Sequence, residues 1–186
     1  GRIEFRNLTA AYVARGPAAL CSFSLVVTAG GKLAICGLSG SGKTSVMLAL
    51  LQMLIAEEGD IVVDGQSIAA RGTWTVSSSL AVISQEFGVL PGFNLRQHVD
   101  PCACATDEQV TDALRRVKLW DEQLEEIGLE GEIKGGMLSA GQMLLIAVAV
   151  AMIRRRTCKI VLVDEATSNV DGDTAKLVQT LLRRDF

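Results

Sequence analysis

The chain has 186 residues, of which 49% are hydrophobic and 21% charged, and its formal net charge at pH 7 is −3. This length suits a single domain with a substantial core, and the apolar fraction excludes a disordered chain. The small negative charge argues against nucleic acid as a partner, because nucleic-acid-binding proteins usually present a basic face.

In the first half of the chain, alternating or continuous apolar runs predict strands. They cover residues 3–5, 23–27, 32–36, 59–65 and 79–84. A helix is predicted from about Thr44 to Ile55, directly after a glycine-rich segment. The dipeptide Asp64-Gly65 predicts a tight turn at the end of its strand.

In the second half of the chain, most sequence patterns predict helices. Thr106–Gln109 has the pattern of a capping box, an acidic helix is predicted over 119–127, and further helices begin near Ser139 and Thr174. The apolar run Met143–Ile153 is shorter than the roughly 20 residues that a bilayer span needs, so we expect a buried helix. Residues 159–163, of which the last four are apolar, predict a strand covered on both faces.

The single histidine and two of the cysteines are candidate metal ligands by residue type. We expect the single histidine, His98, at the surface or in a loop. Cys102 and Cys104 have no second Cys or His pair at zinc spacing, which predicts reduced thiols and no metal site.

Together, the predicted strands and helices indicate one domain. It has an α/β core formed by residues 1–86 and 151–186, with a helical insertion over 87–150.

The segment from Gly37 to Thr44 matches Gly-x-x-x-x-Gly-Lys-Thr, the P-loop pattern for binding nucleoside triphosphates. Glycines allow backbone N–H groups to converge on phosphate oxygens, and a following helix adds its positive dipole end. Lys43 is placed for the β- and γ-phosphates of ATP, and the Thr44 hydroxyl for Mg²⁺. The residues expected to bind nucleotide here are Gly37, Leu38, Ser39, Gly40, Ser41, Gly42, Lys43, Thr44 and Ser45.

Two adjacent carboxylates, Asp164 and Glu165, follow the predicted strand over 159–163. Ligands of open α/β sheets bind at the carboxyl ends of strands. We therefore expect Asp164 to hold Mg²⁺, and Glu165 to activate the attacking water as a general base.

The segment Leu138–Gln142 resembles the signature motif of the ATP-binding cassette (ABC) ATPases, and Ser139 precedes Asp164 by 25 residues, as in that family. The resemblance implies an ABC ATPase fold: a P-loop NTPase core with a mixed or parallel sheet, antiparallel N-terminal strands and an inserted helical subdomain. It also implies a head-to-tail dimer, in which the signature of one cassette covers the γ-phosphate bound by the other. The residues implied in that contact are Ser139, Ala140, Gly141 and Gln142.

The same resemblance assigns three further positions. Gln85 matches the glutamine that senses Mg²⁺ and the attacking water. Ser168–Asp171 matches the D-loop, which links the two sites of the dimer. Tyr12, 25 residues before Gly37, resembles the aromatic residue that stacks on adenine.

Leu95–Pro101 and the segment after Glu165 resemble the C subfamily, the multidrug-resistance-associated exporters, in their second nucleotide-binding domain. The family's switch histidine lies beyond Phe186, so we expect a truncated domain that hydrolyses ATP weakly on its own. The implied partners are a second cassette and transmembrane domains, at the cytosolic face of a membrane.

Two other function classes are compatible with the residues. One is a soluble ABC ATPase of DNA repair or translation, although no coiled-coil, zinc or basic-linker segment is visible in the sequence. The other is a regulatory module that binds ATP without turnover. The presence of Glu165, the expected general base, argues against this class.

Overall fold

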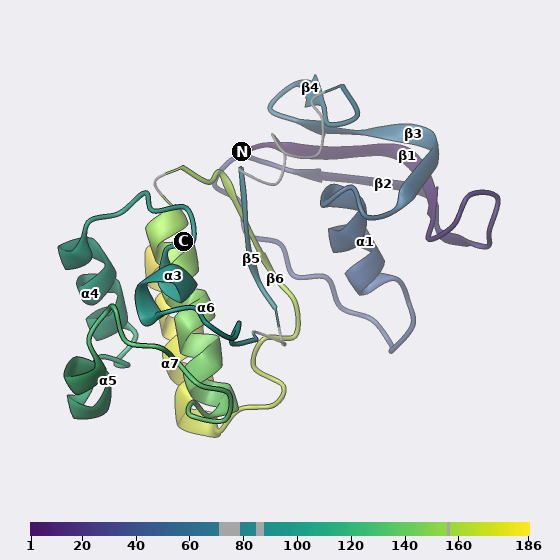
Figure 1. Ribbon diagram of the computed structural model, residues 1–186. Helices are drawn as coiled ribbons and strands as arrows, with labels where there is room; N and C mark the ends of the chain where they lie inside the picture. The colour runs from purple at the N-terminus through teal and green to yellow at the C-terminus, as the bar shows by residue number, and fades with distance from the viewer. Residues whose placement is uncertain (71–78, 85–87, 156) are drawn as a thin grey trace. The chain divides into compact units, whose positions relative to one another are not determined.

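The computed structural model describes residues 1–70, 79–84, 88–155 and 157–186. The chain forms two compact units, Gly1–Leu80 and Ala81–Phe186, each with its own secondary structure. Figure 1 shows the elements of both units along the chain. The predicted division into 1–86 with 151–186 and an insertion over 87–150 stays a prediction.

The described part of the first unit is an antiparallel sheet with helix α1 (Lys43–Leu50). Strands β1 (Ile3–Ala11), β2 (Ala18–Val27), β3 (Ile55–Val63) and β4 (Gln66–Ser67) follow the order β2-β1-β3-β4. Each neighbouring pair runs antiparallel, and the predicted Asp64-Gly65 turn joins β3 to β4. Helix α1 lies against β2 and β3 and buries Val46, Ala49 and Leu50.

The second unit is mostly helical. Its helices are α3 (Leu95–Val99), α4 (Asp107–Arg116), α5 (Glu122–Ile127), α6 (Ala140–Arg154) and α7 (Gly172–Asp185). Two strands, β5 (Leu80–Ile83) and β6 (Ile160–Val163), pair with each other. The Asp164 N–H donates to the Ile83 carbonyl oxygen at 3.0 Å, so the carboxyl ends of the two strands lie side by side.

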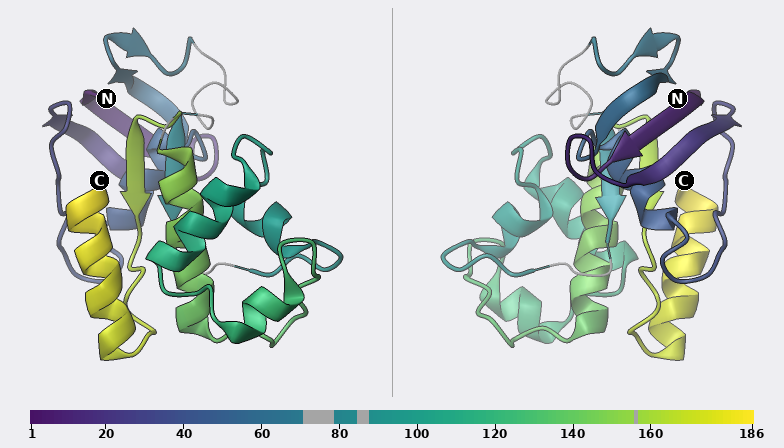
Figure 2. Two further views of the ribbon diagram at one scale, coloured as in Figure 1. Left: turned by 90° about the vertical axis from the view of Figure 1, so that its left-hand side faces the viewer. Right: turned by 90° about the vertical axis from the view of Figure 1, so that its right-hand side faces the viewer.

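Helix α6 is the centre of the second unit. It contacts α3, α4 and α7, which surround it in Figures 1 and 2. Nine of its fifteen residues are buried, which confirms the predicted buried helix. The hydrophobic cluster around it joins residues from β5, all five helices and the segment after β6, so the predicted insertion shares one core with β5 and α7.

Two predictions in the first unit were wrong. Residues 31–38, all of them described, form no strand, and the side chains of Leu33 and Ile35 are 51% and 41% exposed. A short apolar run becomes a strand only where a neighbouring strand offers ladder partners, and this run is paired with neither sheet. The predicted helix over 44–55 ends at Leu50, because Gln52 adopts a left-handed φ of 58° and Ile55 pairs with Ala11 at the start of β3.

Three predictions in the second unit also need correction. The helix predicted over 119–127 begins only at Glu122, after its N-cap Asp121. Strand β6 is not covered on both faces, since Val163 is 42% exposed and only Ile160 is buried. His98 is neither at the surface nor in a loop: it is buried within α3.

Candidate functional site

The glycine-rich loop ends in a helix start that no side chain caps. Gly42 is the N-cap of α1 with a φ of 90°, a left-handed conformation that favours glycine. The Lys43 ammonium donates to the carbonyl oxygens of Gly37 and Leu38, both at 3.0 Å. An ammonium has three N–H groups, so the third N–H group of Lys43 can donate to a ligand bound at the loop. The loop itself is exposed, with Leu38 at 85%.

Tyr12 lies beside this helix start. Its hydroxyl is 2.9 Å from the hydroxyl of Ser45, which is buried in the first turn of α1. The Tyr12 side chain is 57% exposed, so its ring has a face open to a stacking partner. The structure therefore brings Tyr12 to the phosphate loop within the first unit, and its role towards adenine stays a prediction.

The segment Ser139–Gln142 starts α6 with a complete capping box. The Ser139 hydroxyl oxygen accepts from the Gln142 N–H at 3.2 Å, and the Gln142 side-chain oxygen accepts from the Ser139 N–H at 2.9 Å. The cap uses a lone pair of the hydroxyl and leaves its proton available to donate. Ser139 and Ala140 are exposed, and Gly141 is half-buried.

Helix α7 begins with a charged cap. The Asp171 carboxylate accepts from the N–H groups of Asp173 and Thr174 at 3.0 and 2.9 Å, and from the Thr174 hydroxyl at 2.7 Å. The hydrogen bond from the Thr174 side chain, followed by that from its backbone, holds the pKa of Asp171 below its ordinary value. The last residue of the expected D-loop is thus a fixed helix cap.

Asp164 and Glu165 follow β6 directly. Asp164 is half-buried and anchored by the backbone bond to Ile83, whereas Glu165 is exposed. Glu165 has a left-handed φ of 41°, unusual for a residue with a side chain, and such strain clusters at functional sites. The Ser168 N–H and hydroxyl both donate to the Glu165 carbonyl oxygen, which holds this turn.

Comparison with known proteins places these motifs in one family. Residues 20–168 match the family model described as "ABC transporter". This range includes the phosphate loop, the signature segment and the two carboxylates. The chain belongs to the ABC transporter family. The match implies the P-loop NTPase fold and an ATP-binding domain.

Curated ABC proteins align with the whole chain. The chain is 37% identical over 186 residues to "Multidrug resistance protein fer6" of Mycosarcoma maydis and 34% identical over 186 residues to an "ABC-type transporter" of Gibberella zeae. It is 35% identical over 189 residues to "ABC transporter C family member 3" of Dictyostelium discoideum. The alignments cover 100% of this chain but only 13% to 14% of the relatives' lengths.

The described part of this ABC domain contains no helix long and apolar enough to cross a bilayer. Gln85 lies outside the described residues. The phosphate loop and Tyr12 belong to the first unit, and the signature, D-loop and carboxylate residues belong to the second. Within the second unit, the starts of α6 and α7 lie together, because a Cβ built on Gly141 would be 3.4 Å from the Thr174 side chain.

Sequence reasoning missed the role of His98 in the ABC domain. Its Nδ1 lies 2.8 Å from the Asn94 carbonyl oxygen, and its Nε2 accepts from the Leu90 N–H at 2.9 Å. A carbonyl only accepts, so this pair of bonds defines the neutral tautomer with the proton on Nδ1. Its position four residues after Asn94, the cap of α3, was the signal that the sequence offered.

Sequence reasoning also missed Asp185, which is buried at the end of α7 and faces three arginines. Arg116 lies 2.5 Å away, Arg184 3.0 Å and Arg155 4.0 Å. Burial alone would raise the pKa of Asp185, but the hydrogen bond from Arg184 and the charge of Arg116 outweigh burial and lower it. This cluster joins the C-terminal ends of α4, α6 and α7.

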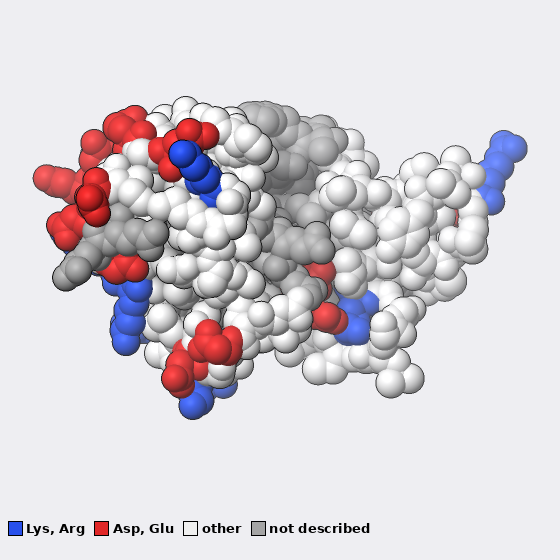
Figure 3. All heavy atoms as spheres, turned by 60° about the horizontal axis from the view of Figure 1, so that its bottom comes forward, with Lys and Arg blue, Asp and Glu red and all other residues white. Residues whose placement is uncertain are grey.

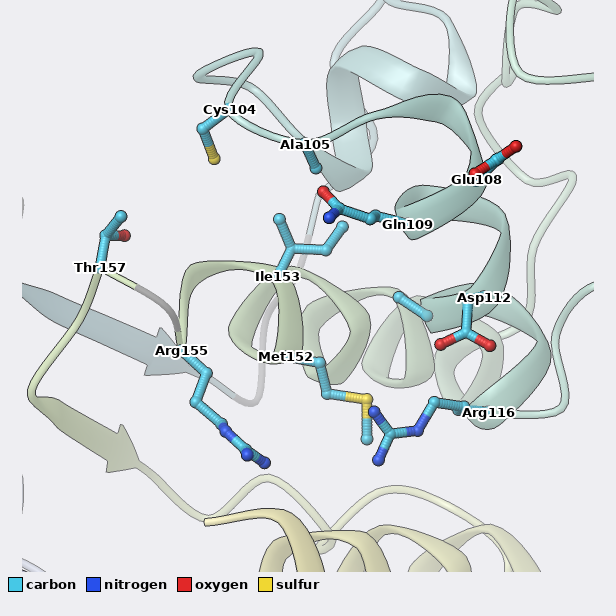
Figure 4. Close-up of a pocket in the computed structure, with 11 residues that line it drawn as sticks. Cys104, Ala105, Glu108, Gln109, Asp112, Arg116, Met152, Ile153, Arg155 and Thr157 are labelled. Carbon is cyan, nitrogen blue, oxygen red and sulfur yellow. The ribbon is translucent and has the colours of Figure 1, made fainter.

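A hollow of about 730 Å³ adjoins this cluster (Figure 4). Its walls come from α4, the end of α6 and the neighbouring loops, and they include Gln109, Arg116, Met152 and Arg155. No predicted site residue in the described part of the chain lines it. The hollow therefore has no part in the nucleotide site that the motifs predict.

Acidic side chains gather over α4 and α5, as the red spheres at the left of Figure 3 show. They include the exposed residues Asp107, Glu108, Asp112, Asp121, Glu125 and Glu126. Such a surface would repel nucleic-acid phosphates.

Proposed function

We propose that this chain is the ATP-hydrolysing nucleotide-binding domain of an ABC exporter, in which ATP binding and hydrolysis drive transport across a membrane. The observation that carries this proposal is a phosphate loop on an uncapped helix, together with an exposed, capped signature turn in a chain of the ABC family. An uncapped helix start offers N–H groups and a positive dipole end to phosphate.

Each predicted site residue has a role in the proposal. Lys43 binds the β- and γ-phosphates, Tyr12 stacks on adenine, and Glu165 accepts the proton of the attacking water. Oxygen ligands from Thr44, Asp164 and Gln85 would hold Mg²⁺, which prefers oxygen. The half-buried Asp164 carboxylate and the exposed Thr44 hydroxyl supply that chemistry. When bound, Mg²⁺ would neutralise phosphate charge during transfer.

We further propose that Ser139–Gln142 covers the γ-phosphate held by a second nucleotide-binding domain. The Ser139 proton and the N–H groups of Ala140 and Gly141 are the donors left open by the capping box. Transmembrane domains of the same transporter would complete the assembly, with this domain at the cytosolic face. Relatives named "C family member" support membership of the C subfamily. The segment after Glu165 resembles the second nucleotide-binding domain of that subfamily, which favours this position for the chain.

The test is Glu165→Gln in the intact transporter that carries this domain. Turnover should fall at least roughly 100-fold, because a general base contributes about that much or more. ATP affinity should change by less than about threefold, since the amide keeps the shape of the carboxylate. Phosphate release and titration with a fluorescent ATP analogue measure the two quantities.

Glu125→Gln is the matched control, because it makes the same chemical change at an exposed position of α5. It should leave both quantities unaltered. Turnover that persists in Glu165→Gln would contradict the role of Glu165. A wild-type transporter that binds ATP but releases no phosphate would instead favour a regulatory module.

A further inference from the structure

The first turns of α6 and α7 are in contact, so the signature segment and the expected D-loop are neighbours in the same chain. A Cβ added to Gly141 would lie 3.4 Å from both the Cγ2 and the Oγ1 of Thr174, and 3.6 Å from a carboxylate oxygen of Asp171. A methyl group at position 141 would thus be in ordinary van der Waals contact with α7. The backbone of the signature segment and the Thr174 side chain therefore lie within about one methyl group of each other.

Thr174 is held in place at this contact. Its hydroxyl donates to Asp171 Oδ2 at 2.7 Å, and its N–H donates to Asp171 Oδ1 at 2.9 Å. Two bonds from one residue to one carboxylate fix both the backbone and the χ1 angle of Thr174. The half-buried Thr174 side chain is thereby held in place beside the Gly141 backbone.

The opposite ends of the same two helices are also joined. Asp185, in the last turn of α7, forms an ion pair with Arg155, the C-cap of α6, and Arg155 also donates to the Asp185 carbonyl oxygen. In Figure 4 the side chains of Arg155 and Arg116 extend towards the end of α7. Contacts at both ends restrain the tilt of one helix against the other, because tilting would break a contact.

We propose that Thr174 is a positioning residue that sets the signature turn, Ser139–Gln142, against the D-loop turn, Ser168–Asp171, of the same chain. A displacement of the D-loop moves the Asp171 carboxylate, Thr174 follows through its two hydrogen bonds, and Gly141 follows through packing. The consequence for ATP turnover rests on the proposed function, since it requires a signature that covers a partner's ATP. The coupling itself requires only the contacts described above.

The experiment compares three variants of the intact transporter. Thr174→Val keeps the volume beside Gly141 and removes the hydroxyl bond to Asp171, whereas Thr174→Ser keeps that bond. Thr180→Val is the matched control: the Thr180 hydroxyl lies on the same helix, is exposed, and donates at 2.8 Å to the Lys176 carbonyl oxygen, away from α6. Hydrogen exchange of the Gln142 amide, which donates to the Ser139 hydroxyl oxygen, is measured first without nucleotide, followed by kcat and KM for ATP.

In Thr174→Val, exchange at the Gln142 amide should rise about threefold or more, because a looser contact opens more often. The kcat should fall roughly tenfold and the KM for ATP should stay within about twofold, since misplaced groups slow chemistry while the phosphate loop is untouched. Thr180→Val should behave like the wild type. Thr174→Ser keeps the bond to Asp171 but loses the methyl group beside Gly141, so its exchange and kcat should lie closer to the wild type than those of Thr174→Val. A purely structural role would lower thermal stability without separating kcat from KM.

Equal exchange and equal kcat in Thr174→Val and Thr180→Val would overturn the positioning role. The failure of the proposed function has a different signature. If no variant, the wild type included, hydrolyses ATP, the proposed function fails, while the exchange data still decide whether Thr174 holds the signature turn.

Discussion

The starts of helices α1 and α6 are both expected to meet phosphate, yet they are built in opposite ways. Helix α1 begins at Gly42 with no side-chain cap, whereas α6 begins at Ser139 with a reciprocal capping box. A side-chain cap is worth about 1 kcal/mol of helix stability. Helix α1 lacks that stabilisation, and its first N–H groups are not used by any capping side chain.

The difference shows how each helix start can serve its expected ligand. The loop before α1 surrounds a phosphate with backbone donors and one ammonium, so a side-chain cap would compete with the ligand. The capping box of α6 occupies the N–H groups of Ser139 and Gln142 and leaves the Ser139 proton, Ala140 and Gly141 open. That arrangement suits a helix start that covers a phosphate bound elsewhere better than a loop that surrounds a phosphate.

The largest test of this comparison removes the ammonium from the uncapped start. Lys43→Ala should weaken ATP binding roughly 100-fold, because a charged hydrogen-bond donor to phosphate contributes about 2 to 3 kcal/mol. Equilibrium titration with a fluorescent ATP analogue measures the affinity. Lys32→Ala, which removes the same charge in the exposed segment before the loop, should alter the affinity less than about threefold. Equal losses in both variants would remove Lys43 from the phosphate site.

A second test strains the uncapped start. Gly42→Ala should lower the free energy of unfolding by about 1 to 2 kcal/mol, because a side chain is unfavourable at a φ of 90°. The added Cβ would also lie 3.3 Å from the Ala19 carbonyl oxygen. Urea denaturation followed by circular dichroism measures the change. A variant as stable as the wild type would show that α1 does not need the left-handed conformation at its N-cap.

A third test removes the cap from α6. Ser139→Ala should cost about 1 kcal/mol of unfolding free energy, the usual value of a lost serine cap. Ser168→Ala provides a matched control that removes a hydroxyl at another exposed turn, where the backbone bond from Ser168 to Glu165 remains. If Ser139→Ala destabilises no more than its control, the capping box contributes nothing measurable and α6 is held by its buried face alone.

The smallest test uses pH to separate the hydroxyl cap of α6 from the carboxylate cap of α7. Because the folded pKa of Asp171 is lowered, its capping contribution is present above the unfolded value of about 3.9 and is lost as pH falls through the folded pKa. Amide protection at Asp173 and Thr174, corrected for intrinsic exchange, should decrease only as the pH falls below about 3.9, because the folded pKa of Asp171 is lowered. Protection at Gln142 should stay constant, since a serine hydroxyl does not titrate there. Parallel losses at both helices would point to general acid unfolding.

Local signals in the sequence were sufficient for most of the helices. The Thr106–Gln109 box, the buried run within α6 and the helix predicted near Thr174 each depend on neighbours three or four residues apart, which the chain itself brings together. The strands were harder to predict. The run over 32–36 had the composition of a strand but lacks a ladder partner, whereas Ile55, at the end of a predicted helix, pairs with β1 instead.

The sequence alone determined the phosphate loop, the signature, the paired carboxylates and hence the family, because backbone cradles and caps require particular residues at fixed spacing. Only the tertiary structure decided what those motifs touch. It placed Tyr12 on Ser45, Thr174 on Gly141, and His98 and Asp185 in buried hydrogen-bonded positions. These contacts join residues from different turns, loops or helices, and packing of the whole unit, which no local pattern records, brings them within bonding distance.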